Sequence, residues 1–83
     1  MDDLIDQAGR IVAAHGVDAL EGLVLALLAE RSPQATGTLA RRMALEHALV
    51  RRSASRLEEA GWIACEPSSG RSPGMRLTLL ESP

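Results

Sequence analysis

The segment from about residue 18 to 31 constrains the fold most, because it carries apolar residues on nearly every side of a helix. They are Leu20, Leu23, Val24, Leu25, Leu27 and Leu28. A helix that is apolar all round must be covered on every side by other elements. The uninterrupted apolar run, Leu23 to Ala29, falls far short of the roughly 20 residues that cross a membrane. The segment therefore predicts a central core helix, with the rest of the 83-residue chain packed around it as one small domain.

Residues 2–15 predict an amphipathic helix that precedes the central one. Gly16 is expected to end it in a left-handed conformation, and Asp18 and Glu21 have the spacing of a capping box that begins the next helix. The apolar stripe of this first helix either covers the chain's own core or pairs with a second copy. Because two-fold homodimers are the commonest oligomers, we expect a homodimer interface at Leu4, Ile5, Ala8, Ile11 and Val12.

The central helix is followed by a break and a third helix. Ser32-Pro33 ends the central helix, since the residue before a proline disfavours helical geometry. Residues 34–36 are compatible with a very short extended segment. Thr36 or Thr38 is expected to cap a third helix over about 37–43.

A fourth helix follows after only a brief turn. The turn lies around residues 44–46, and the helix is expected over about 47–60, where Gly61 ends it. Two helices joined by so short a turn form a helix-turn-helix.

After Gly61 the hydrophobic pattern changes from a helical period to alternation. Residues 62–66 and 75–79 predict two strands, and residues 67–74 form a loop by composition. The expected fold class is therefore α+β, mainly α: a winged helix-turn-helix of about four helices and a C-terminal two-stranded β-hairpin wing. We expect residues 1–83 to form a single such domain with residues 2–15 as an extra N-terminal helix.

The helix-turn-helix segment also resembles a known family. It contains Leu39-Ala40-Arg41-Arg42-Met43-Ala44-Leu45, then Val50-Arg51-Arg52, then Arg56-Leu57-Glu58-Glu59-Ala60-Gly61. This spacing resembles the DNA-binding domain of MarR-type transcriptional regulators, in a short form without their C-terminal dimerisation helices. The resemblance implies a regulator that binds double-stranded DNA. The wing departs from that family, because its loop has Arg71 but no Asp two residues before it.

The charge distribution favours a polyanionic partner. The net charge of −2 divides into −5 for residues 1–30, +5 for residues 31–56 and −2 for residues 57–83. The opposite charges of neighbouring segments indicate that the basic one has such a partner. All nine basic residues are Arg, whose planar guanidinium suits phosphate and guanine edges.

The recognition helix, about 47–60, is expected in the major groove, with the wing, 67–74, on the flanking groove or backbone. Several arginines have an alternative as surface charges: Arg41 and Arg42 could pair with Glu46 or another acid, and Arg56 with Glu59 or Glu30. The expected DNA-binding residues are Thr36, Arg41, Arg42, His47, Arg51, Arg52, Ser55, Arg56, Arg71 and Arg76.

Other functions have less support in the sequence. The single cysteine, Cys65, cannot form an internal disulfide and reads as a buried structural thiol. No metal site, cofactor, small-molecule ligand or membrane contact is expected, and no nucleophile–base arrangement indicates an enzyme. The acidic N-terminus has the wrong sign for a secretory signal, so we expect a cytoplasmic protein. The alternative function is a winged-helix adaptor that binds another protein and not DNA.

Overall fold

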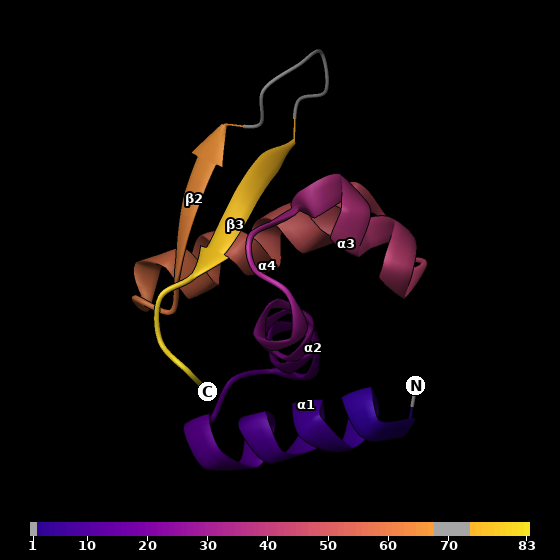
Figure 1. The fold of residues 1–83 in the computed structure, drawn as a ribbon, viewed down its shortest axis with the longest axis vertical. Coiled ribbons are helices and arrows are strands. Elements are labelled where there is room, and N and C mark those ends of the chain that lie inside the picture. The colour runs from indigo at the N-terminus through magenta and orange to yellow at the C-terminus, as the bar shows by residue number, and fades with distance from the viewer. Residues whose placement is uncertain (1, 68–73) are drawn as a thin grey trace.

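The computed structural model describes residues 2–67 and 74–83, which form helices around a small antiparallel sheet (Figure 1). The elements in chain order are α1 (Asp2–His15), α2 (Ala19–Glu30), β1 (Gln34–Ala35), α3 (Thr36–Met43), α4 (His47–Glu59), β2 (Ile63–Pro67) and β3 (Met75–Leu79). The sheet has the strand order β1-β3-β2. This is a winged-helix fold, which confirms the predicted class.

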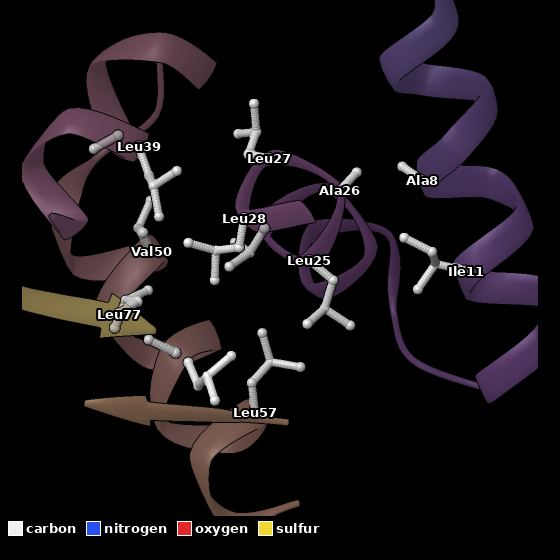
Figure 2. Packing of buried hydrophobic residues seen from close by; sticks show 14 residues of the cluster. Ala8, Ile11, Leu25, Ala26, Leu27, Leu28, Leu39, Val50, Leu57 and Leu77 are labelled. Carbon is white, nitrogen blue, oxygen red and sulfur yellow. The ribbon is translucent and has the colours of Figure 1, made fainter. Parts of the chain in front are cut away.

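The apolar helix α2 lies at the centre, as predicted. In Figure 1 it is seen end-on, with α1 on one side and α3, α4 and the sheet on the other. Figure 2 shows its side chains directed to both sides. Ala26 lies toward Ala8 and Ile11 of α1, whereas Leu28 lies toward α4 and the sheet. The fully buried large apolar side chains are Val24, Leu25, Leu27, Leu28, Leu39, Val50, Leu57, Ile63 and Leu77.

Local signals fix the junction between α1 and α2. Gly16 adopts a left-handed φ of 70°, which places the chain for the next helix. The capping box forms as predicted: the Glu21 backbone N–H donates to Asp18 Oδ1 at 2.7 Å, and the Asp18 N–H donates to Glu21 Oε1 at 2.8 Å. These two bonds satisfy donors that the start of α2 would otherwise leave free.

Part of the expected dimer interface is instead core. Ala8 and Ile11 are only 6% and 4% exposed, because they pack against α2 of the same chain. The prediction that Ala8 and Ile11 form part of a homodimer surface is therefore corrected, because both belong to the core of the chain. Leu4 packs at the edge of the same core, whereas Ile5 is 56% exposed.

The short extended segment expected at residues 34–36 forms a strand, β1, and makes the predicted two-stranded hairpin a three-stranded sheet. β1 pairs with β3, with Gln34 opposite Leu77 and Ala35 opposite Arg76. The Leu79 backbone N–H also donates to Ser32 Oγ at 2.9 Å. The hairpin of β2 and β3 therefore joins the helical layer through β1.

The prediction that Thr36 or Thr38 caps α3 is wrong. The N-cap is Ala35, which has no side-chain cap hydrogen bond, and Thr36 is already the first residue of the helix. The Thr36 side chain is turned into the interior, where it has other partners. At the other end of α3, Ala44 takes a left-handed φ of 54° and begins the turn to α4.

Within residues 2–67 and 74–83, no helix on its own combines the length and apolar composition needed to cross a bilayer. Residues 3–15 and 19–30 reach that length and apolar composition only when the two helices are combined, and the chain bends by 117° between them.

Candidate nucleic-acid interface

The outer face of α4 carries two exposed arginines, Arg51 and Arg52. Its inner face is the one predicted from the sequence, since Val50, Ala54 and Leu57 are buried. Arg51, Arg52 and Ser55 are exposed. Among the described residues, neither Arg51 nor Arg52 forms an ion pair. Both guanidinium groups are therefore available to an external anion or base edge.

The first residue of α4 is tied to the base of the wing. His47 Nε2 lies 2.6 Å from Thr36 Oγ1, and the Met75 backbone N–H donates to the same oxygen at 3.1 Å. A Cβ placed on Gly74 would lie 3.1 Å from Thr36 Oγ1 and 3.4 Å from His47 Cε1, so the chain passes closely here. We name Thr36, His47, Gly74 and Met75 the wing junction. It joins the starts of α3, α4 and β3.

Thr36 itself is not available to a ligand. It is 0% exposed, so its predicted place among the DNA-contacting residues is wrong. A hydroxyl can both donate and accept, which lets one buried oxygen bond both a ring nitrogen and a backbone N–H. Thr36 therefore positions His47, which is half-buried. The sequence reasoning missed Gly74 and the Met75 backbone, because nothing local marks their approach to α3 and α4.

The two arginines of α3 have different surroundings. Arg42 donates to Glu30 Oε1 and to Gln34 Oε1, each at 3.2 Å. Gln34 is only 6% exposed, and its amide donates to the backbone carbonyls of Leu27 and Arg31. Arg42 is thus held against the end of α2, with Glu30 as the acid partner that the sequence left open.

Arg41 is less restrained. It is exposed, and its guanidinium lies 3.4 Å from Thr38 Oγ1 of the same helix. A single long hydrogen bond to an exposed hydroxyl holds a flexible side chain weakly. Arg41 is therefore the arginine of α3 that is free to turn toward a phosphate.

Of three further predicted residues, two form exposed ion pairs and one lies outside the described residues. Arg56 pairs with Asp18 at 3.6 Å, and not with Glu59 or Glu30 as the sequence suggested. Arg76 pairs across the hairpin with Glu66 at 3.5 Å, where the two residues are direct strand partners. Both are exposed pairs, which contribute about 0–1 kcal/mol to stability. Arg71 lies outside the described residues.

Cys65 is only partly buried, and not fully buried as the sequence predicted. It is half-buried on β2, with its sulfur 3.9 Å from the Ala54 carbonyl oxygen. Burial, and then the negative charge and hydrogen bond of Glu58, raise the pKa of the Cys65 thiol to about 11. Reactive cysteines have a lowered pKa, so this environment disfavours thiolate chemistry. Over residues 2–67 and 74–83, no cluster of three His, Cys, Asp or Glu side chains could hold a metal ion.

Solved structures share this arrangement over nearly the whole chain. The disulfide-formed AbfR matches with a TM-score of 0.75 and 25% identity, over 96% of this chain and 56% of that one. YusO from Bacillus subtilis matches with a TM-score of 0.74 and 23% identity, over 95% and 56%. Overoxidized AbfR bound to DNA matches with a TM-score of 0.75 and 23% identity, over 93% and 57%. This chain therefore spans slightly more than half the length of each.

No family profile matches the sequence, and no curated protein matches it. The structural matches establish that this chain shares its fold with AbfR and YusO.

Proposed function

We propose that this chain is the DNA-binding domain of a MarR-like transcriptional regulator that reads double-stranded DNA in a sequence-specific way. The observation that carries the proposal is that Arg51 and Arg52, on the outer face of α4, are exposed and form no ion pair with the residues that the structure describes. A second support is that AbfR, with the same fold, has been solved bound to DNA.

In this proposal α4 lies in the major groove. An α-helix with its side chains is about 10–12 Å across, which matches a major groove about 12 Å wide. Arg51 and Arg52 would pair with guanine O6 and N7, each such contact being worth about 1–3 kcal/mol of discrimination. His47 and Ser55 would flank them along the same helix. The wing, 67–74, would lie on the adjacent groove or backbone, with Arg71 as its contact.

The remaining arginines would position the domain on the backbone. Arg41 is free to meet a phosphate. Arg56 and Arg76 would exchange an exposed carboxylate partner for a phosphate at small cost, because such pairs contribute little. Arg42 would contribute least, since Glu30 and Gln34 both hold it.

We propose that the domain acts as a homodimer in the cytoplasm. DNA sites with two-fold symmetry are read by two-fold symmetric dimers, which place one recognition helix on each half-site. In Figure 1, α1 lies on the side of α2 away from α3, α4 and the sheet. Association through α1 would therefore leave both α4 helices uncovered.

The test is the affinity of single variants for a labelled DNA duplex from the region upstream of the coding sequence. Arg51→Ala and Arg52→Ala should each weaken binding about 5- to 150-fold, the range given by 1–3 kcal/mol. Thermal stability should be unchanged, because neither side chain is buried. The matched control is Arg31→Ala, which removes one exposed arginine outside the proposed interface. Equal affinity of both variants and the wild type would rule the proposal out.

A lysine series separates base reading from charge. Arg51→Lys and Arg52→Lys keep the positive charge but lose the two-pronged donor geometry. We expect them to keep the salt dependence of binding and to lose preference for the native duplex over a scrambled one. Full retention of that preference would show that these residues contact only the backbone.

A further inference from the structure

The buried hydroxyl of Thr36 has a single proton to donate, and its surroundings determine where that proton goes. Thr36 is 0% exposed, so bulk water does not reach the hydroxyl. The oxygen already accepts the Met75 backbone N–H at 3.1 Å. Within residues 2–67 and 74–83, its one other hydrogen-bond partner is His47 Nε2, at 2.6 Å. The Thr36 hydroxyl therefore donates its proton to this ring nitrogen.

The opposite arrangement would leave a buried donor without an acceptor. If His47 Nε2 carried the hydrogen and donated it to Thr36, the Thr36 hydroxyl would have no acceptor among the described residues. A buried donor without a partner is unfavourable, so the wing junction favours the first arrangement. In a neutral imidazole one nitrogen accepts a hydrogen bond and the other donates one. Because Nε2 accepts, the ring proton of His47 lies on Nδ1.

His47 carries this donor into the region proposed to meet DNA. It is the first residue of α4, and its ring lies against Gly74 at the base of the wing. The residue is only half-buried, and Nδ1 has no hydrogen-bond partner within the described ranges. Residues at the N-terminal end of a recognition helix contact base edges, and neighbouring donors contact phosphates. A donor at this place is therefore suited to an acceptor on DNA.

We propose that Thr36 holds His47 as the neutral tautomer with its proton on Nδ1, and that this N–H donates to an acceptor of bound DNA. The acceptor is a purine N7 or a phosphate oxygen. Thr36 is a positioning residue: it does not touch DNA, but it sets the orientation of the ring and makes its free nitrogen a donor. The DNA contact rests on the proposed function, whereas the tautomer is a property of the free protein.

The tautomer is measured on the free, 15N-labelled protein at pH 8, from the ring nitrogen resonances of its two histidines. His47 should show a protonated Nδ1. His15 should show the opposite form, because its Nε2 lies 3.1 Å from the Pro83 backbone oxygen. Thr36→Ser should keep the Nδ1–H form of His47, and Thr36→Val should lose it, since no hydroxyl then donates to Nε2. A wild-type His47 protonated on Nε2, or a valine variant with unchanged ring resonances, overturns the proposal.

The contact with DNA is tested with two amide substitutions of His47. H47Q places an amide oxygen near the position of Nε2 and keeps an acceptor for Thr36, but it has no donor at the position of Nδ1. H47N places an amide N–H near Nδ1 and does not reach Thr36. H47Q should keep the wild-type Tm and bind the native duplex about 2- to 10-fold more weakly, the effect of one hydrogen bond. H47N should have a lower Tm and yet bind more tightly than H47Q; the reverse order of affinities overturns the proposal.

Modified duplexes identify the acceptor and separate this inference from the proposed function. A 7-deazapurine removes N7 from one base, and a methylphosphonate removes one charged oxygen from one phosphate. At the contacted position the modification should weaken the wild type more than H47Q, which already lacks the bond. Such coupling at a 7-deazapurine assigns the acceptor to a base, coupling at a methylphosphonate assigns it to the backbone, and coupling at neither overturns the proposal.

The wild type provides the remaining control. If it binds the native duplex no more tightly than H47Q does, only this inference is contradicted. If it binds no duplex at low salt, the proposed DNA binding is contradicted, and the ring nitrogen resonances still decide whether Thr36 sets the tautomer of His47.

Discussion

Replacing Thr36 by valine should separate the wing from the recognition helix. Valine has almost the same shape as threonine but no hydroxyl, so Thr36→Val removes the oxygen that bonds both His47 Nε2 and the Met75 backbone N–H. Thr36 is 0% exposed, and water cannot take the place of its hydroxyl without opening the wing junction. The change is therefore a deletion of two hydrogen bonds at one buried point.

The expected loss follows from those two bonds. A buried polar group left without a partner costs about 1–3 kcal/mol. His47 and Met75 are only half-buried and can regain some solvation, so we expect a total of about 2–3 kcal/mol. For a domain of this size that loss lowers the Tm by roughly 10–20 °C. Thr36→Ser is the matched control, because it keeps the hydroxyl and loses one methyl group, at about 1 kcal/mol.

The assay is urea unfolding, followed by far-UV circular dichroism and by the fluorescence of Trp62, the only aromatic residue of the Phe, Trp and Tyr types. Trp62 precedes β2 and packs edge-on against His15 of α1, with ring centroids 4.7 Å apart, so its emission reports on the contact between the start of the hairpin and α1, and circular dichroism reports on the helices. Thr36→Val should unfold at a lower urea midpoint than Thr36→Ser. A valine variant as stable as the serine variant would refute the reasoning, since the hydroxyl would then contribute nothing.

Three further perturbations have defined outcomes. Gly22→Ala should lower the free energy of unfolding by about 1–3 kcal/mol in the same urea assay, because the new Cβ would lie 2.7 Å from Val12 Cγ2 and push α1 away from α2. Unchanged stability would show that α1 can shift without cost. Asp18→Ala should cost about 1 kcal/mol in thermal unfolding, since it removes one half of the capping box, and Asp18→Asn should recover most of that loss. Cys65 should react with Ellman's reagent at pH 8 about 100-fold more slowly than a thiol of ordinary pKa, because burial and Glu58 raise its pKa from 9.0 to about 11. Since the fold favours the protonated thiol, the difference in free energy of unfolding between the wild type and Cys65→Ala should be constant below pH 9, and the wild type should lose stability between pH 9 and 11. Fast labelling of Cys65 at pH 8 would contradict the raised pKa.

The helices were predictable because their signals are local. Gly16, Asp18 and Glu21 act within a few residues of each other, and the structure places the end of α1 and the start of α2 accordingly. The helical period also identified which side of α4 is buried. Such patterns depend only on spacing along the chain, which the sequence displays directly.

The features that were missed depend on contacts between distant segments. A short extended segment was expected at residues 34–36, but its pairing with β3 was not, because a two-residue strand carries no signal of its partner. Thr36 looked like a helix cap because threonine favours that position, yet its partners lie 11 and 39 residues away. The same limit applies to Arg56, whose partner Asp18 lies at the start of another helix.

The stripe on α1 shows what a periodic pattern leaves open. Periodicity showed that one face of α1 is apolar, but not what covers each part of it. Packing in the structure assigns Ala8 and Ile11 to the core and leaves Ile5 exposed. Which arginines are already paired within the protein is likewise a tertiary property, and it distinguishes Arg51 from Arg42.

The most direct test of DNA recognition is a titration of the protein into a labelled duplex from its own upstream region. A scrambled duplex of the same length and composition is titrated beside it, and both are measured at several salt concentrations. We expect tighter binding to the native duplex, with an affinity that falls by about 0.9 log units per log unit of salt for each phosphate contact. No binding to either duplex at low salt would contradict the account and would favour a winged-helix module that binds another protein.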